Sequence, residues 1–331
     1  MQELLRSLTE KYAPSGFEKS LREDIRARIK PFVDEMRVDA LGNLIAIKKG
    51  TSGKGKRIML AAHMDEIGLI ASHIDDNGFI RFTSLGTPFA KYLPGGRVRF
   101  LNGIEGVIGT ERMEPIHETP PLEKMYIDIG AISRKDSAIE IGSVAAFTRS
   151  FERLGNRLVA KSMDDRAGVV VLIEILRTLR TTPHEIYFVF TAQEEVGTRG
   201  SGPATFGIEP EIGIAVDVTP AEDTPNHPRA TIRLGNGPAI KIRDPHMISD
   251  PKIVAWMIKT ANHAHIPFQR EVLLAGGTDA RAMQISGKGV AAGAISIPCR
   301  YVHSPSEMID YEDLKNTAKL LKALLSRSVE L

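Results

Sequence analysis

Short apolar runs that alternate with helical patterns are the feature that most restricts the fold of this chain. Residues 185–191, EIYFVFT, are rich in β-branched and aromatic side chains and are bounded by turn-forming residues. Neighbouring segments instead carry apolar residues at three- and four-residue steps, the spacing of an amphipathic helix. Strands separated by helices predict a largely parallel, helix-covered sheet, and therefore an α/β fold. The expected strands are 43–47, 57–62, 185–191, 212–218 and 290–297, and the expected helices are two within 3–30, then 167–179, 251–263 and 311–325.

The middle of the chain has a different pattern. Between residues 68 and 160, short β-like runs such as GFIRF and MYIDIG are separated by Gly, Pro, Asn and Asp, and no long helical pattern occurs. This pattern is typical of a small β-rich module. Because the alternation of helix and strand resumes after it, we expect one α/β domain built from residues 1–67 and 161–331. A β-rich domain of residues 68–160 would be inserted into it.

Composition excludes several classes of protein. The 331 residues carry 43 Lys and Arg against 41 Asp and Glu without a long block of one sign, so a nucleic-acid-binding face is not expected. No apolar run approaches the roughly 18 residues of a membrane span, and the N-terminus lacks the layout of a signal peptide. The single cysteine, Cys299, cannot form an intrachain disulfide. We expect a cytoplasmic protein with no membrane or nucleic-acid partner.

Acids and a histidine follow three of the expected strands. His63 and Asp65 come directly after strand 57–62, Glu194 and Glu195 follow strand 185–191, and Asp217 lies in strand 212–218. In parallel α/β sheets the carboxyl ends of the strands border the ligand crevice. Three strands therefore bring acidic groups and an imidazole to one edge of the sheet.

Two further residues extend this set. Asp164 precedes an apolar helix, and His303 lies in a late loop. Two histidines with four or more carboxylates suit divalent ions such as Zn²⁺, Co²⁺ or Mn²⁺. Two ions that share a carboxylate and a water would offset the repulsion among the acids and generate a hydroxide, while an unligated acid carries the proton.

Each of these residues alone has a simpler explanation. Asp164 could be a helix N-cap, His303 an ordinary loop histidine, and Glu194 with Glu195 a charged surface pair. Glu66 points to the opposite face of its strand from His63 and is not expected to be a ligand. The residues alone do not show which acid binds a metal and which moves a proton.

The order of the motifs resembles the M42 family of dinuclear metallo-aminopeptidases, the tetrahedral or TET peptidases. The motifs are HMDEIG, KSMDDRAG, TAQEEVGTRG, AVDVTPAEDTP, GGTDA and YVHSPSEM, with PSGFE near the N-terminus, LGNLIA, and YIDIGA within the inserted module. The resemblance runs essentially from end to end. It implies a zinc-peptidase-like mixed sheet covered by helices, with an inserted PDZ-like dimerisation domain.

The resemblance also implies roles for individual residues. His63 and Asp217 would hold one metal, Glu195 and His303 the other, and Asp164 would bridge the two. Glu194 would be the general base, and Asp65 would accept a hydrogen bond from His63 and fix its tautomer. Residues near the substrate would be Gly277, Thr278 and Asp279.

The implied activity is the removal of N-terminal residues from short peptides, through a hydroxide held between two divalent ions, Zn²⁺ or Co²⁺, per subunit. The family also implies dimers that assemble into a tetrahedral dodecamer. An N-deacylase or carboxypeptidase on the same scaffold would use similar metals. A glycosidase would use two carboxylates and no metal, and a non-catalytic assembly protein would need a broken ligand set.

Overall fold

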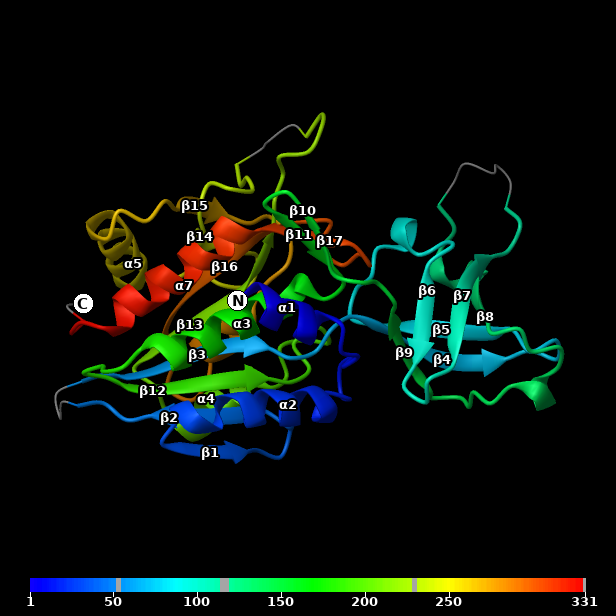
Figure 1. Cartoon of the computed structure of the whole chain (residues 1–331), viewed down its shortest axis with the longest axis horizontal. Coiled ribbons are helices and arrows are strands. Elements are labelled where there is room, and N and C mark those ends of the chain that lie inside the picture. The colour runs from blue at the N-terminus through cyan, green and yellow to red at the C-terminus, as the bar shows by residue number, and fades with distance from the viewer. Residues whose placement is uncertain (52–54, 114–118, 228–230, 330–331) are drawn as a thin grey trace.

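The structure is a computed structural model that describes residues 1–51, 55–113, 119–227 and 231–329 (Figure 1). The α-helices are α1 (Gln2–Thr9), α2 (Lys19–Ile29), α3 (Met163–Thr178), α4 (Ser201–Ile208), α5 (Pro251–His263), α6 (Asp279–Gln284) and α7 (Tyr311–Leu325). Short 3-10 turns cover Lys30–Phe32, Ala90–Tyr92, Leu122–Lys124 and Arg134–Asp136.

A large mixed sheet forms the body of the molecule. Its main path runs β1-β2-β12-β3-β13-β16-β17-β11-β10, and β14 and β15 join it beside β16. The strands are β1 (Glu35–Val38), β2 (Leu44–Lys48), β3 (Arg57–His63), β10 (Glu152–Leu154), β11 (Arg157–Ala160), β12 (Glu185–Thr191), β13 (Ile212–Pro220), β14 (Ala239–Arg243), β15 (Gln269–Val272), β16 (Ala291–Arg300) and β17 (Glu307–Asp310).

The centre of this sheet is parallel, as the sequence predicts. The strands β12, β3, β13 and β16 run in the same direction, whereas β1, β2, β17, β11 and β10 extend the sheet through antiparallel pairs. In the parallel register Thr191 lies opposite His63, and Ala215 lies opposite Ala61. The carboxyl ends of β12 and β3 are therefore level with one another, and β13 continues beyond them to Pro220.

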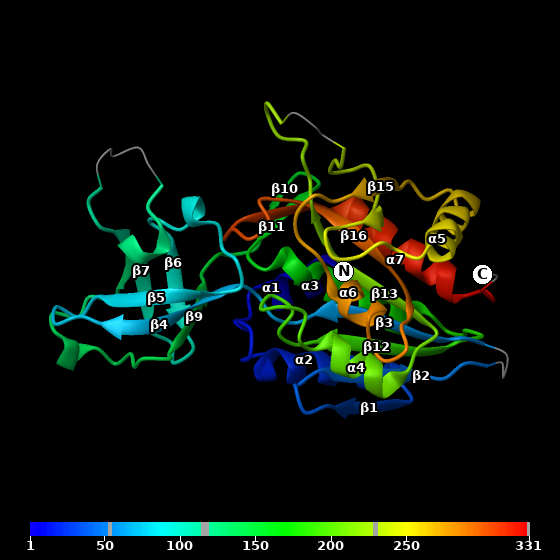
Figure 2. The same cartoon turned by 180° about the vertical axis from the view of Figure 1, so that it is seen from behind.

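Helices cover both faces of the sheet. The helices α1, α2, α3, α5 and α7 lie on the face seen in Figure 1, and α4 and α6 lie on the opposite face, seen in Figure 2. The larger core, which includes Leu5, Val170 and Leu321, lies under the first group of helices. A smaller core that includes Met59, Ala204 and Met283 lies under the second. The predicted α/β fold with a helix-covered mixed sheet is confirmed.

Capping residues explain where the two longest late helices begin. The Asp250 side chain accepts hydrogen bonds from the N–H groups of Lys252 and Ile253, with Pro251 at the first helical position of α5. The Asp310 side chain accepts in the same way from the N–H of Glu312 at the start of α7. These caps fix the helices that support the sheet from one side.

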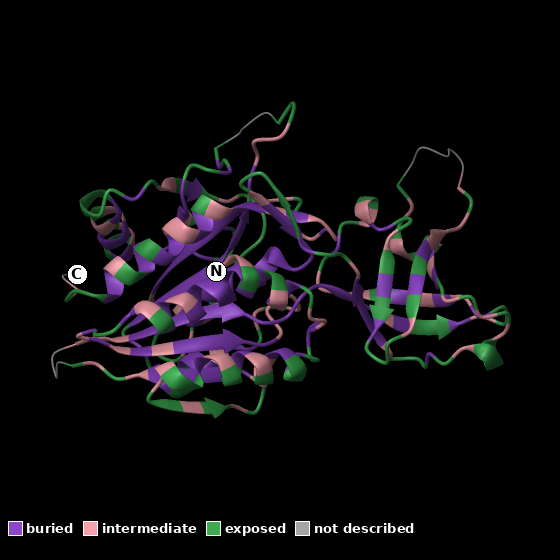
Figure 3. Ribbon diagram, in the orientation of Figure 1, coloured by how far each residue is buried: buried purple, intermediate pink, exposed green. Residues whose placement is uncertain are grey.

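The inserted segment folds into a closed six-stranded antiparallel barrel. Its strand order is β4-β5-β8-β7-β6-β9, and it projects from one side of the body (Figure 1). Apolar side chains such as Phe82, Val98 and Ile127 form a buried core of its own. Figure 3 shows buried stretches along the strands of the projecting unit. The strands are β4 (Gly68–Ile74), β5 (Ile80–Leu85), β6 (Arg97–Phe100), β7 (Glu105–Thr110), β8 (Met125–Asp128) and β9 (Val144–Phe147).

The end of the inserted segment differs from the prediction. Strands β10 and β11 fall within residues 68–160, yet β11 pairs with β17 and both strands extend the large sheet. The reason is that Leu158 and Ala160 belong to the apolar core of the body and not to that of the barrel. The barrel therefore ends with β9.

No helix among the described residues is long and apolar enough to cross a membrane.

Candidate metal centre

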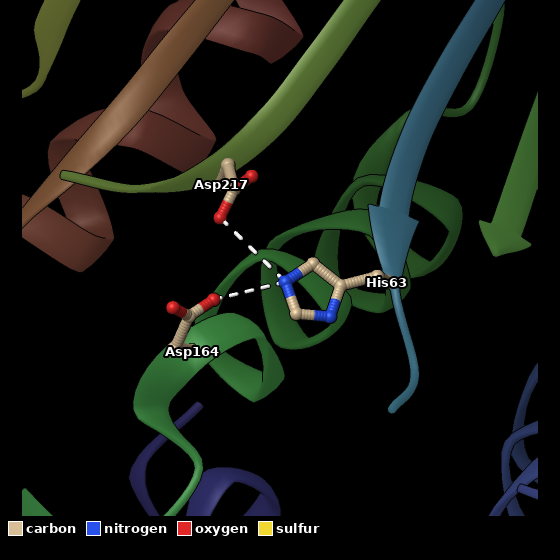
Figure 4. A group of neighbouring side chains, drawn as sticks. All are labelled: His63, Asp164 and Asp217. Carbon is tan, nitrogen blue, oxygen red and sulfur yellow. Dashed lines mark hydrogen bonds and ion pairs between the residues drawn. The ribbon is translucent and has the colours of Figure 1, made fainter. Parts of the chain in front are cut away.

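One group of possible ligands joins the ends of β3, α3 and β13. The Nε2 atom of His63 lies 2.9 Å from Oδ1 of Asp164 and 3.8 Å from Oδ1 of Asp217 (Figure 4). The three ligand atoms lie within 4.8 Å of one another, and all three residues are buried. The group offers one imidazole nitrogen and two carboxylates, a donor set that suits a divalent ion.

A second group shares Asp164 with the first. The Nε2 atom of His303 lies 3.4 Å from the other carboxylate oxygen of Asp164, Oδ2, and 3.2 Å from Oε2 of Glu195. These ligand atoms also lie within 4.8 Å of one another. Each oxygen of Asp164 therefore faces a different histidine.

Both imidazoles are oriented through their second ring nitrogen. The Nδ1 atom of His63 lies 3.1 Å from the backbone carbonyl of Asp65 and 3.5 Å from its carboxylate. The Nδ1 atom of His303 lies 3.0 Å from the carbonyl of Thr87, on the segment between β5 and β6 of the barrel. A carbonyl accepts only from a protonated nitrogen, so these contacts leave Nε2 of each ring facing the acids.

The electrostatics of the two groups are those of acids crowded together. Burial raises the pKa of Asp217 to about 8, and the charge of Asp164 acts in the same direction. Burial also raises the pKa of Glu194 and of Glu195, although the histidines oppose it. Burial would lower the pKa of His303, yet the charges and hydrogen bonds of Glu195 and Asp164 raise it to about 12.

The charge balance provides a test of whether divalent cations fit this site. Among the described residues, the ion pairs of Asp164, Asp217 and Glu195 are formed with the two imidazoles, and Oε1 of Glu195 is buried without a hydrogen-bond partner. Cations would neutralise the acids and give that oxygen a partner. With nitrogen and oxygen donors only, the residues fit Zn²⁺ or Co²⁺.

The turn that carries Glu194 and Glu195 is held by buried carboxylates. Asp65 accepts the N–H of Glu194 at 3.0 Å and the N–H of Glu195 at 3.1 Å. Glu18 accepts the N–H of Gln193 at 3.1 Å, and Ser15 donates its hydroxyl hydrogen to Asp65 at 2.5 Å. Three successive N–H groups thus bind two carboxylates. The PSGFE turn supplies one of them, Glu18, and supports the other, Asp65, through Ser15.

The remaining predicted residues have different surroundings. Thr278 caps α6 by accepting the N–H of Ala280, and Asp279 accepts a hydrogen bond from the Thr191 hydroxyl. Both side chains are at most 2% exposed, which argues against their direct contact with a substrate in this conformation. Gly277 is exposed. Glu66 belongs to neither ligand group and instead forms a buried ion pair with Lys161 at 2.7 Å.

Sequence reasoning assigned no role to four polar residues that contact the site. Ser15 and Glu18 support the 193–195 turn, Asp165 accepts the N–H of His63, and Glu307 accepts the N–H groups of Asp164 and His303. All four lie within motifs that were already recognised, PSGFE, KSMDDRAG and YVHSPSEM. In the sequence, these four residues are marked as candidates only by their closeness to the motif residues.

Comparison with known proteins gives matches over most of the chain. The model of the M42 glutamyl aminopeptidase family matches residues 42–320. The lysyl aminopeptidase of Pyrococcus furiosus is 36% identical over 98% of this chain and 96% of its own.

Two solved structures are also similar. The aminopeptidase APDkam598 of the archaeon Desulfurococcus kamchatkensis has a TM-score of 0.95 and 39% identity over 98% of this chain and 94% of its own. The TET1 peptidase of Pyrococcus horikoshii, which can assemble into a tetrahedron or a large octahedral shell, has a TM-score of 0.88 and 32% identity over 98% of both chains. With its fold, its acidic centre and these matches, the chain belongs to the M42 family of aminopeptidases.

Proposed function

We propose that this aminopeptidase removes N-terminal residues from short peptides with two divalent ions per chain that share Asp164. The observation that carries the proposal is the position of Asp164, whose two oxygens each face a different histidine. His63 and Asp217 would complete one site, and Glu195 and His303 the other. When bound, the two ions would polarise the scissile carbonyl and make a water molecule more acidic.

Glu194 is the proposed proton carrier. It is the acid of the 193–195 turn that belongs to neither ligand group. Burial raises the pKa of its carboxyl well above the ordinary value, although His63 opposes this shift. An acid with a raised pKa can take a proton from the attacking water and return it to the leaving amine nitrogen near neutral pH.

We propose that Asp65 orients His63 through its backbone carbonyl as well as through its carboxylate. Its carboxylate accepts two N–H groups of the 193–195 turn, and its carbonyl lies closer to His63 than its carboxylate does. One residue therefore supports both the first histidine and the turn of the proton carrier. Among the residues proposed near the substrate, Gly277 is the one with open access.

The side-chain preference of the enzyme is left open by its relatives. The family model is described as a glutamyl aminopeptidase, and the Pyrococcus furiosus relative is a lysyl aminopeptidase, so the favoured N-terminal residue differs in charge within the family. We propose a preference for neutral or aliphatic residues, tested with a panel of aminoacyl anilides. N-acylated and C-terminally labelled peptides in the same panel separate an N-deacylase or carboxypeptidase.

Self-association is also proposed. The Pyrococcus horikoshii relative can assemble into a tetrahedron or a large octahedral shell. In this chain, the segment between β8 and β9 of the barrel carries two exposed apolar side chains, Ile132 and Ile141. We propose that the barrel, as a PDZ-like dimerisation domain, forms dimers that assemble further into a dodecamer. We also propose that the barrel is a separate domain and that the protein is cytoplasmic.

Glu194→Gln tests the mechanism directly. The amide cannot accept the proton, so we expect kcat on an aminoacyl anilide to fall by about 10²–10⁴-fold. Metal content should stay unchanged, because Glu194 is not a proposed ligand. Glu209→Gln, which alters an exposed glutamate beyond the same turn, should leave both unchanged. Full activity of Glu194→Gln would remove Glu194 from the proposed mechanism.

A further inference from the structure

Glu307 connects the two ligand groups without belonging to either. It stands at the start of β17 and is 2% exposed. Its Oε2 atom accepts the N–H of Asp164 at 3.0 Å, and its Oε1 atom accepts the N–H of His303 at 2.8 Å. The carboxylate thus binds the main chain of two residues that are far apart in sequence and that face each other across one ligand group.

The two contacts require a carboxylate at this position. Each oxygen of Glu307 receives one N–H group, so both ends of the side chain must be acceptors. A glutamine of the same size offers one acceptor and one NH₂ donor, which would meet one of the two N–H groups donor to donor. The position therefore requires two acceptor oxygens, which an ionised carboxylate has and an amide of the same shape lacks.

The position of Glu307 is also unfavourable for stability alone. A buried carboxylate is costly without a paired cation. Among the described residues no lysine or arginine forms an ion pair with Glu307, although the charges of His303 and Lys161 act on it. His303 adopts a left-handed backbone conformation, with φ of +60°, which is disfavoured for a residue with a side chain. The bond from its N–H to Glu307 holds this conformation and, with it, the direction of the imidazole.

We propose that Glu307 is a positioning residue that fixes Asp164 and His303 for the second divalent ion, the one bound by Asp164, Glu195 and His303. This inference rests on the proposed function, because it presumes that these residues bind a metal. Glu307 would act through the main chain and contact neither the ion nor the substrate.

The test is calorimetric titration of the chelated full-length chain with Zn²⁺. The wild type should bind two ions, and Glu307→Gln should bind the second roughly 10–100-fold more weakly, the usual effect of losing a partner of a ligand. Glu312→Gln is the matched control, because Glu312 is half-exposed at the start of the next helix and pairs with Lys315. It should titrate like the wild type.

Glu307→Asp separates positioning from space filling. Aspartate keeps two acceptor oxygens but is shorter, whereas glutamine keeps the size but loses one acceptor. The inference predicts that the aspartate variant binds the second ion more tightly than the glutamine variant. The reverse order, or unchanged affinity in both, would overturn it. So would a Glu307→Gln chain that fails to fold by circular dichroism, since the carboxylate would then serve folding. A wild type that binds no zinc would instead refute the proposed function.

Discussion

At the scale of single residues, Asp164 and Asp217 show how the site stores negative charge. The charge of Asp164 acts on the carboxyl of Asp217, and His63 lies between them at 2.9 and 3.8 Å. Asp164 is held in its ionised form, since the hydrogen bonds of both histidines lower its pKa against the effect of burial. Burial and the nearby charge of Asp164 consequently make ionisation of Asp217 unfavourable.

We therefore expect the free energy of unfolding of the chelated chain to depend on pH. The pKa of Asp217 is raised from 3.8 to about 8 in the folded chain. Between these values the unfolded chain loses the proton that the folded chain keeps, so Asp217 lowers stability progressively as pH rises from about 4 to 8. Asp217→Asn removes this contribution. Its free energy of unfolding in chelator should exceed that of the wild type by an amount that grows between pH 5 and pH 8.

Urea unfolding at several pH values in chelator measures this difference. The same variant should bind zinc more weakly, because it loses a proposed ligand. A constant difference across the pH range would show that Asp217 is not the group that titrates. These candidate residues can be selected from the sequence, because His63 and Asp217 lie in the last part of apolar strands and Glu195 follows one. The raised pKa values were not, since they depend on distances that only the fold sets.

At the scale of elements, the 193–195 turn depends on a segment from the other end of the chain. Glu18 uses one oxygen, Oε1, to accept the N–H groups of Gly16 and Gln193. Gln193 has φ of +58°, so its backbone needs such support. The sequence predicted the turn and the motif PSGFE separately, but 175 positions separate Glu18 from Gln193, and no local pattern could connect them.

Glu18→Leu should disturb the turn, and Glu18→Gln should not. Leucine leaves two partly buried N–H groups without their acceptor, which costs at most about 1–3 kcal/mol for each group, and we expect roughly tenfold lower activity. Glutamine keeps a carbonyl oxygen that can accept both bonds. Denaturant unfolding and kcat are the measurements. The control is Glu23→Leu, at an exposed position of α2, the helix that Glu18 precedes. Equal loss in both Glu18 variants would contradict this account of the turn.

At the scale of the whole molecule, the loop that joins β5 to β6 of the barrel contacts the candidate metal centre. The carbonyl of Thr87 orients His303, and Gly86 packs beside Glu195. A Cβ atom on Gly86 would lie 2.8 Å from Ile67 and 3.1 Å from the Glu195 carboxylate. The sequence predicts the inserted module but not the contact of this module with the site. The residues that make the contact, Gly86 and Thr87, are uncharged and belong to no recognised motif.

Gly86→Ala tests this contact, with Gly95→Ala as its control. Both glycines have φ of +77°, but a Cβ atom on Gly95 would meet nothing within 4 Å. Each variant should lose roughly 1–2 kcal/mol of stability from the left-handed backbone. Only Gly86→Ala should also weaken binding of the ion near Glu195, as measured by zinc titration. Equal metal binding in the two variants would show that the barrel does not influence the centre.

The central claim, that two divalent ions share Asp164 in an aminopeptidase centre, is tested by one titration. The full-length chain is chelated, zinc or cobalt is returned in steps, and bound metal and aminoacyl anilide hydrolysis are measured at each step for the wild type and Asp164→Asn. We predict that wild-type activity disappears on chelation and returns as two ions bind, whereas Asp164→Asn binds fewer ions and stays inactive. Activity that survives chelation, or full activity with one ion per chain, would contradict the claim.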